Sequence, residues 1–187
     1  MRRYIFAVVL LAGSIVTSAY ALTTTTNYPI LVGCTSLGQL CEPPAEVAVS
    51  TSEVIRAVEF TASAVHCSEI RVYISIDGVL EYTSAFLGPG GSTGVINVGP
   101  VAPGSHTIEV QAEGTVGGCN AGRLISWAGD LKVTTSLYAG TPGQPSCHGD
   151  SVSLLANTYG GLPNAARSLG FANVAALQRN IDSYCQR

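Results

Sequence analysis

The stretch Glu69–Phe86, which reads EIRVYISIDGVLEYTSAF, decides the expected fold of this chain. Every second side chain from Ile70 to Ile76 is apolar and the side chains between them are mostly polar, which is the pattern of a β-strand buried on one face. Asp77-Gly78 follows, a pair that a type I′ turn prefers because both of its central residues need positive φ. Residues 79–86 then return as the partner strand. The stretch therefore predicts an antiparallel hairpin.

The same alternation continues on both sides of this hairpin. From residue 45 to residue 136 it predicts about seven strands over roughly 90 residues, separated by glycine- and proline-rich turns. This spacing is typical of an antiparallel β-sandwich. We therefore expect a mainly β protein with one sandwich domain over residues 45–136, preceded by a loosely structured lead-in segment over residues 22–44.

A short motif adds a resemblance to known proteins. The run Ala102–Val110, APGSHTIEV, comes after the hairpin built on Ile76–Val79. Together they resemble the bacterial immunoglobulin-like and fibronectin-III-like modules of secreted and surface proteins, over about half of the chain. The resemblance implies a sandwich of that type and a role outside the cytoplasm.

The amino terminus reads as a signal peptide. Residues 2–3 are basic, an apolar run extends from Ile5 to Val16, and small residues at Ala19 and Ala21 suit cleavage after residue 21. No later stretch approaches the ~20 apolar residues that a membrane-spanning helix needs. We expect a bacterial protein that is secreted or periplasmic, with residues 1–21 removed and no transmembrane segment.

Charge argues against nucleic acid as a partner. The chain has 9 basic and 12 acidic side chains, and removal of the two signal arginines leaves 9 − 2 = 7 against 12, a net charge of −5. Residues 162–181 are similar to a helix-turn-helix, but the basic side chains near them are only Arg167, Arg179 and Arg187. Phosphate contacts require more positive charge than this. We expect no nucleic-acid binding.

Six cysteines in an exported chain favour disulfides over free thiols. No close ligand pairs of the C-x2-C kind are present, so we expect no metal and no cofactor. Pairing each cysteine within its own segment gives three predicted bridges, which are Cys34 with Cys41, Cys67 with Cys119, and Cys147 with Cys185.

The carboxyl-terminal part changes to helical periodicity. Residues 137–146 read as a linker, and residues 147–187 as three short helices, the third capped by Asn173. A core of this size usually needs a covalent cross-link to be stable. The Cys147–Cys185 bridge would stabilise it by ~3 to 4 kcal/mol on the loop-entropy model. The stretch beginning at Pro145–Gly149 also resembles short modules that end uncharacterised secreted bacterial proteins.

Two motifs give alternatives. Gly90–Gly94 satisfies the letters G-x-S-x-G around Ser92, which leaves open a small secreted hydrolase using Ser92 or His106. A hydrolase serine of this kind follows a strand and precedes a helix, whereas Ser92 follows a loop, and no nucleophile or carboxylate is indicated beside His106. We therefore expect no catalytic residues. Leu31–Cys34 is similar to a lipobox, which would anchor the chain through Cys34.

These observations favour a non-catalytic binding or structural module of the bacterial cell envelope or exterior. Fixed sandwich loops suit partner contact, and Gly88–Ser92 and Gly114–Gly122 are the candidates. The expected partner is an envelope protein or a glycan. A periplasmic inhibitor or assembly factor is the second alternative.

Overall fold

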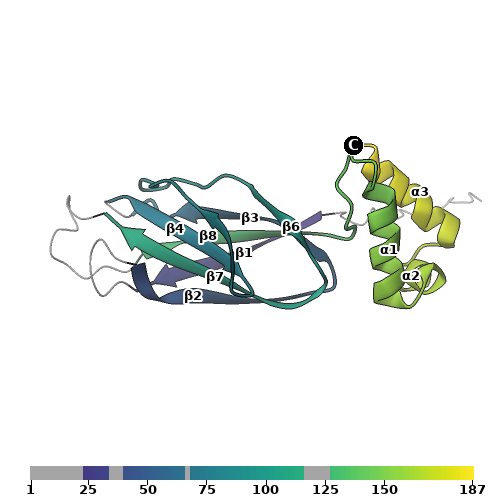
Figure 1. The fold of residues 1–187 in the computed structure, drawn as a ribbon, viewed down its shortest axis with the longest axis horizontal. Helices are drawn as coiled ribbons and strands as arrows, with labels where there is room; N and C mark the ends of the chain where they lie inside the picture. The colour runs from purple at the N-terminus through teal and green to yellow at the C-terminus, as the bar shows by residue number, and fades with distance from the viewer. Residues whose placement is uncertain (1–22, 34–39, 66–67, 116–126) are drawn as a thin grey trace, which may run out of the picture.

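A computed structural model describes residues 23–33, 40–65, 68–115 and 127–187, and every structural statement below concerns those residues. It contains two four-stranded antiparallel sheets followed by three helices (Figure 1). This confirms the expected mainly β sandwich with a helical end. In spatial order, one sheet holds β1 (Thr23–Val32), β8 (Trp127–Ser136), β3 (Val54–Ala62) and β6 (Ile96–Val101), and the other holds β2 (Leu40–Thr51), β7 (Gly104–Gly114), β4 (Ile70–Ile76) and β5 (Val79–Thr83).

The type of sandwich differs from the expected one. An immunoglobulin domain keeps its first two strands in the same sheet, whereas here β1 and β2 lie in different sheets. The order β1-β8-β3-β6 against β2-β7-β4-β5 is that of an eight-stranded jelly roll. The immunoglobulin-like or fibronectin-III-like type is therefore not confirmed. Side-chain alternation identifies strands but carries no information about which strands pair.

The expected lead-in segment is wrong where the structure describes it. Residues 23–32 form β1 and pair with β8 along their whole length, from Thr23 opposite Ser136 to Val32 opposite Trp127. Residues 40–44 begin β2. The threonine run hides the strand pattern, although threonine is β-branched and suits a strand.

The sandwich core lies between the two sheets. Alternate residues of the decisive hairpin, from Ile70 to Ile76, are buried in it together with Phe60 and Trp127. Positive φ at both Asp77 (51°) and Gly78 (77°) confirms the predicted type I′ turn.

The helical part has its own core. Its helices are α1 (Cys147–Tyr159), α2 (Leu162–Ser168) and α3 (Val174–Cys185), and the Cys147–Cys185 disulfide joins the first to the third. The Asn173 side chain caps α3 by accepting a hydrogen bond from the amide of Ala176 at 2.9 Å. The three helices, this cap and this bridge are confirmed.

The expected linker instead takes part in the helical core. The Tyr138 ring is fully buried there, packs edge-on against the Tyr184 ring at a centroid distance of 5.2 Å, and donates its hydroxyl hydrogen to Asn180 at 2.6 Å. Arg56 of β3 donates to the carbonyl of Ala139 at 2.6 Å. The chain between β8 and α1 therefore joins the two parts through packed contacts.

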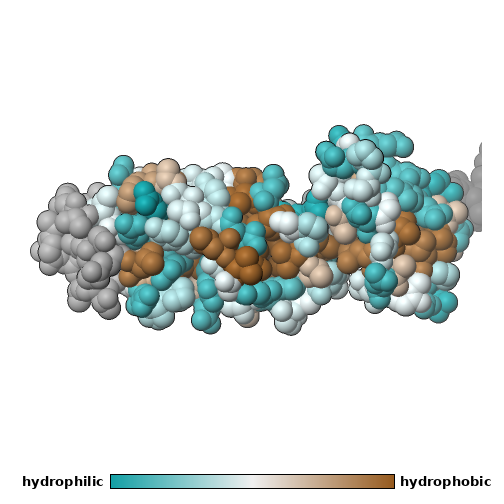
Figure 2. Space-filling model, in the orientation of Figure 1, coloured by the Kyte–Doolittle hydropathy of each residue, from teal (hydrophilic) through white to brown (hydrophobic). Residues whose placement is uncertain are grey.

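Some apolar side chains reach the surface. On the face shown in Figure 2 they gather over the middle of the sandwich and over the helical part. The exposed apolar residues of the described chain include Val79 and Leu80 beside the β4–β5 turn and Val95 before β6. None of the described helices is long and apolar enough to cross a membrane.

Gly140 gives a test of the packed connection between β8 and α1. A Cβ built on Gly140 would lie 2.0 Å from the carbonyl oxygen of Cys147, so the backbone would have to move. We expect Gly140→Ala to lower the free energy of unfolding by about 1 to 3 kcal/mol in a urea titration. The matched control is Gly149→Ala inside α1, where a Cβ meets no atom within 4 Å, and which should leave stability equal or higher. Equal losses in both variants would contradict this packing.

Candidate functional site

The two hydrolase candidates lie at opposite ends of the sandwich. Ser92 bridges Thr61 near the end of β3 and donates its hydroxyl hydrogen to Glu59 at 2.8 Å. His106 stands opposite Val49 of β2, near the other end and on the other sheet. The structure therefore does not bring Ser92 and His106 together as nucleophile and base.

His106 is held between two acceptors. Its Nδ1 lies 2.7 Å from the Asp77 carboxylate and its Nε2 lies 2.7 Å from the carbonyl oxygen of Ala102. Because neither acceptor can donate, the form of the ring that satisfies both contacts is the imidazolium, which carries hydrogen on both nitrogens. The hydrogen bond to Asp77 raises the pKa of His106, against an opposing effect of burial. A ring in this state cannot serve as a general base.

The carboxylate beside His106 was not expected. Asp77 comes from the β4–β5 turn, and its second oxygen accepts from the amide of Thr107 at 2.9 Å. The hydrogen bond from His106 lowers the pKa of Asp77. The sequence separates the two residues by a long interval, so only the pairing of β4 with β7 reveals their contact. His106 thus links the β4–β5 turn to the β6–β7 turn through its contacts with Asp77 and Ala102, and we call this link the tie.

This tie predicts a defined dependence of stability on pH. The folded pKa of His106 is raised, so its contribution is complete below the unfolded value of about 6.5 and is lost as pH rises through the folded pKa. We expect the wild type to lose more unfolding free energy than His106→Gln between about pH 6 and about pH 9 in urea titrations. Parallel pH profiles for the two proteins would refute the imidazolium assignment.

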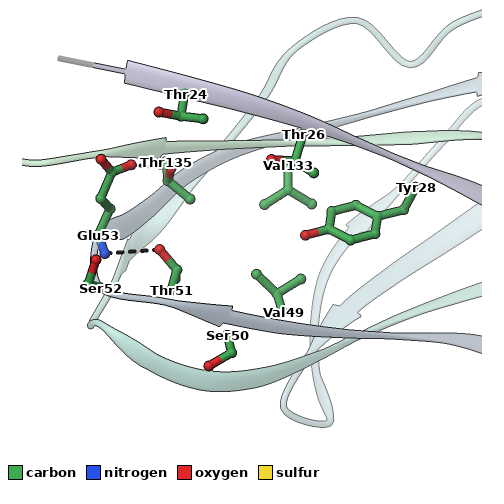
Figure 3. A pocket seen from close by; sticks show the side chains of 10 residues that line it. All are labelled: Thr24, Thr26, Tyr28, Val49, Ser50, Thr51, Ser52, Glu53, Val133 and Thr135. Atoms are coloured by element: carbon green, nitrogen blue, oxygen red, sulfur yellow. Dashed lines mark hydrogen bonds between the residues drawn. The ribbon is translucent and has the colours of Figure 1, made fainter. Parts of the chain in front are cut away.

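A hollow opens between the two sheets at the corner formed by β1, β2, β8 and the β2–β3 turn (Figure 3). Its volume is about 300 Å³. Val49, Val133 and the Tyr28 ring give it an apolar part. The remaining lining is polar and consists of Thr24, Thr26, Ser50, Thr51, Ser52, Glu53 and Thr135.

The hollow forms where the inward side chains of three strands change from apolar residues to threonine at the same corner. The inward positions of β1 are apolar at Ile30 and Val32 and become threonine at residues 24 and 26. The inward positions of β8 and β2 change in the same way, from valine to threonine at Thr135 and Thr51. Polar residues at interior positions of a sandwich are unusual unless they serve a site. Hydroxyl groups therefore stand where the core pattern would place methyl groups.

Two hydrogen bonds hold Glu53 in the hollow, one through its carboxylate and one through its backbone amide. Thr135 donates its hydroxyl hydrogen to Glu53 Oε2, and the amide of Glu53 donates to the hydroxyl of Thr51 at 2.9 Å. Figure 3 shows the Tyr28 hydroxyl pointing into the hollow. Among the described residues, neither this hydroxyl nor Glu53 Oε1 has a hydrogen-bond partner. The hollow thus offers a free acceptor, a free hydroxyl and a flat apolar ring face.

Sequence reasoning missed this site and selected two loops instead. Most of the Gly114–Gly122 loop lies outside the described residues. The Gly88–Ser92 loop is tied to β3 by the amide of Ala62, which donates to Gly91 at 2.8 Å. The available signal was the even-numbered threonines of β1, which are in phase with Ile30 and Val32 and so share their face.

The cysteine predictions have different outcomes. Cys34, Cys67 and Cys119 lie outside the described residues, so two of the predicted bridges stay predictions and the lipid anchor stays untested. Cys41 is buried and disulfide-bonded. Within the described ranges, no group of three or more histidine, cysteine or acidic side chains is placed to hold a metal.

Comparisons with known proteins yield distant likenesses only. No protein-family model matches the sequence. No curated protein matches it. Among solved structures, the CBM36-1 domain of a multidomain xylanase from the hindgut metagenome of Trinervitermes trinervoides matches at 16% identity and a TM-score of 0.32, over 57% of this chain and 96% of that one.

Two other solved structures match at similar levels. They are a VP2 subviral particle of infectious bursal disease virus (19% identity, TM-score 0.31, 61% of this chain and 33% of that one) and an exo-beta-1,3-galactanase from Phanerochaete chrysosporium with galactose (14% identity, TM-score 0.30, 59% and 29%). The chain thus spans about a third of the length of these two proteins. TM-scores near 0.3 do not transfer a function to this chain.

Proposed function

We propose that this chain is a secreted, non-catalytic binding module whose hollow takes a neutral polyhydroxylated ligand, such as a sugar unit of a glycan on the bacterial envelope or outside the cell. The observation that carries the proposal is the coincident change from valine or isoleucine to threonine on the inward faces of β1, β2 and β8. Three separate strands supply hydroxyls to one corner, which is the arrangement of a few convergent polar groups over an apolar surface that binding sites use.

The lining chemistry favours a neutral ligand with many hydroxyl groups. Hydroxyl side chains both donate and accept, and so do the hydroxyls of a sugar. Glu53 adds an acceptor, and the Tyr28 ring adds a flat face for the apolar side of a sugar ring. Among the described residues that line the hollow there is no lysine, arginine or histidine, so an anionic ligand would meet no compensating charge from them.

Binding without catalysis fits the same lining. Glycoside hydrolysis generally uses two carboxylates on either side of the scissile bond. In the part of the chain that the structure describes, Glu53 is the only carboxylate that lines the hollow. Ser92 lies away from it, near the other end of the sandwich. His106 stands opposite Val49 at the edge of the hollow, but the tie to Asp77 and Ala102 occupies both of its ring nitrogens.

Export is supported by the predicted signal peptide and by the Cys147–Cys185 disulfide. Disulfides persist in the periplasm and outside the cell and are rare in a reducing cytoplasm. An exported binding module would meet glycans of the envelope or of the surroundings. This location fits the chemistry of the hollow.

The proposal predicts that binding depends on the inward threonines of β1. We expect Thr24→Val and Thr26→Val each to weaken the binding of a neutral oligosaccharide about fivefold, since one hydrogen bond contributes about 1 kcal/mol. The measurement is isothermal titration with oligosaccharides built from glucose, xylose, galactose or N-acetylglucosamine.

The matched control is Thr25→Val on the same strand. Thr25 points to the outer face, where its hydroxyl lies 3.2 Å from that of Thr134, so its loss should leave affinity unchanged. Tyr28→Phe removes the inward hydroxyl alone and should also weaken binding. Failure of all these oligosaccharides to bind, or equal losses for Thr24→Val and Thr25→Val, would exclude the proposed ligand class at this hollow.

A further inference from the structure

The two sheets end in four edge strands, which are β1, β6, β2 and β5. Three of these edge strands have features that disfavour pairing with another chain. The β6 edge is six residues long and contains Gly99-Pro100. The β5 edge is five residues long and carries Glu81. The β2 edge carries Pro43-Pro44, a register shift and Glu46. Short length, prolines, irregular register and charges all protect an edge strand.

The β1 edge lacks this protection over its first half. Its ten residues pair in unbroken register with β8 and contain no charged side chain. All five residues of Thr23–Asn27 are exposed, and Pro29 interrupts the edge only beyond them. A regular, uncharged, β-branched edge is a template for pairing with another strand.

The directions of the β1 backbone groups follow from two observations. In an antiparallel ladder the N–H and C=O of one residue point to the same side, and that side alternates along the strand. The carbonyl of Ala128 accepts from the amide of Ser63 at 2.9 Å, so Ala128 points toward β3. Leu31, opposite Ala128, therefore points away from β8. Pro29, in phase with Leu31, agrees because proline has no N–H to give to the ladder.

The same alternation places three complete donor and acceptor pairs at the open edge. Thr23, Thr25 and Asn27 are in phase with Pro29, so their backbone N–H and C=O groups point away from β8, toward the edge of the sheet. We call these the outward groups. Two copies can align these groups about a two-fold axis with Thr25 at its centre. Thr23 then faces the partner's Asn27, and each facing pair exchanges two backbone hydrogen bonds. Shifting the register by one facing pair brings Pro29 into the ladder or leaves one of the three residues without a complete partner.

We propose that two copies of this chain associate through β1, antiparallel to β1 of the partner, to form one continuous eight-stranded sheet. The paired segment carries no charge, so no like-charge repulsion opposes it. A second copy fits better than an unrelated extended peptide because the arrangement of outward groups is symmetric about Thr25 and ends at a proline.

The pairing has a consequence for the hollow, and this consequence alone rests on the proposed binding function. Thr24 and Thr26 point inward from β1, so in the paired sheet the threonines of the two copies lie next to one another. The two hollows then border on the same strand pair, and a ligand longer than one sugar unit would contact both copies. The association itself depends only on backbone groups.

The experiment is sedimentation velocity of the protein purified from its producing cells, over a wide range of concentrations and without ligand. We expect a monomer–dimer equilibrium. Thr25→Pro removes the central outward N–H while leaving the ladder with β8 intact, and should raise the dimer dissociation constant by at least about tenfold. The matched control Thr25→Val keeps that N–H and should keep the dimer.

Folding is checked separately. If Thr25→Pro alters the far-ultraviolet circular dichroism, Thr25→Lys serves in its place, because it sets two like charges on the two-fold axis and should also give monomers. Amide exchange at Thr25 should slow as the wild-type concentration rises. A wild type that stays monomeric throughout, or a dimer that persists in a folded Thr25→Pro variant, would overturn the proposal. Loss of glycan binding with the dimer intact would count against the hollow alone.

Discussion

The pairing of β1 with β8 is the contact on which the rest of the structure depends. It holds the amino-terminal strand at the edge of the sandwich in unbroken register, and the alternation of side chains then assigns each residue to one of two faces. Ile30 and Val32 join the core, while Thr24 and Thr26 line the hollow and Thr25 faces outward. A shift of one residue would exchange these faces, moving Ile30 and Val32 out of the core and Thr24 and Thr26 out of the hollow.

The helical part depends on β8, the partner of β1, at the end where the chain leaves this strand. Three short helices enclose a small core, which at this size needs a covalent staple or a neighbour. The structure supplies both. The disulfide joins α1 to α3, and the chain leaving β8 places Tyr138 between the helices, where it meets Tyr184. Because Ser136 ends β8 and lies 3.4 Å from the Tyr184 hydroxyl, the two cores meet through one short segment. Substitutions there should affect both parts of the molecule.

Local features of this fold could be predicted from the sequence, and long-range ones could not. The Asp77-Gly78 turn, the Asn173 cap and the Cys147–Cys185 bridge each depend on residue types with strong local preferences or on one spacing. Which strands pair with one another does not follow from local preferences. For this reason an immunoglobulin-like strand order was expected in place of a jelly roll. The contact between His106 and Asp77 and the corner that forms the hollow both require that pairing to be known. The threonines of β1 carried the right alternation, but their polarity concealed it.

The threonines at the corner have a physical cost that makes their placement informative. Valine has nearly the shape of threonine and would gain free energy from burial at an inward position, whereas a threonine hydroxyl between two sheets must find a hydrogen-bond partner or remain in contact with water. Thr135 finds one in Glu53. Thr24 and Thr26 remain exposed at positions where the sandwich pattern would bury methyl groups. A fold optimised for stability alone would close this corner with valine. Three strands forgo this gain at one place, around the Glu53 carboxylate that Thr135 holds by a hydrogen bond. This coincidence supports the proposed site, which must stay open to a polar ligand.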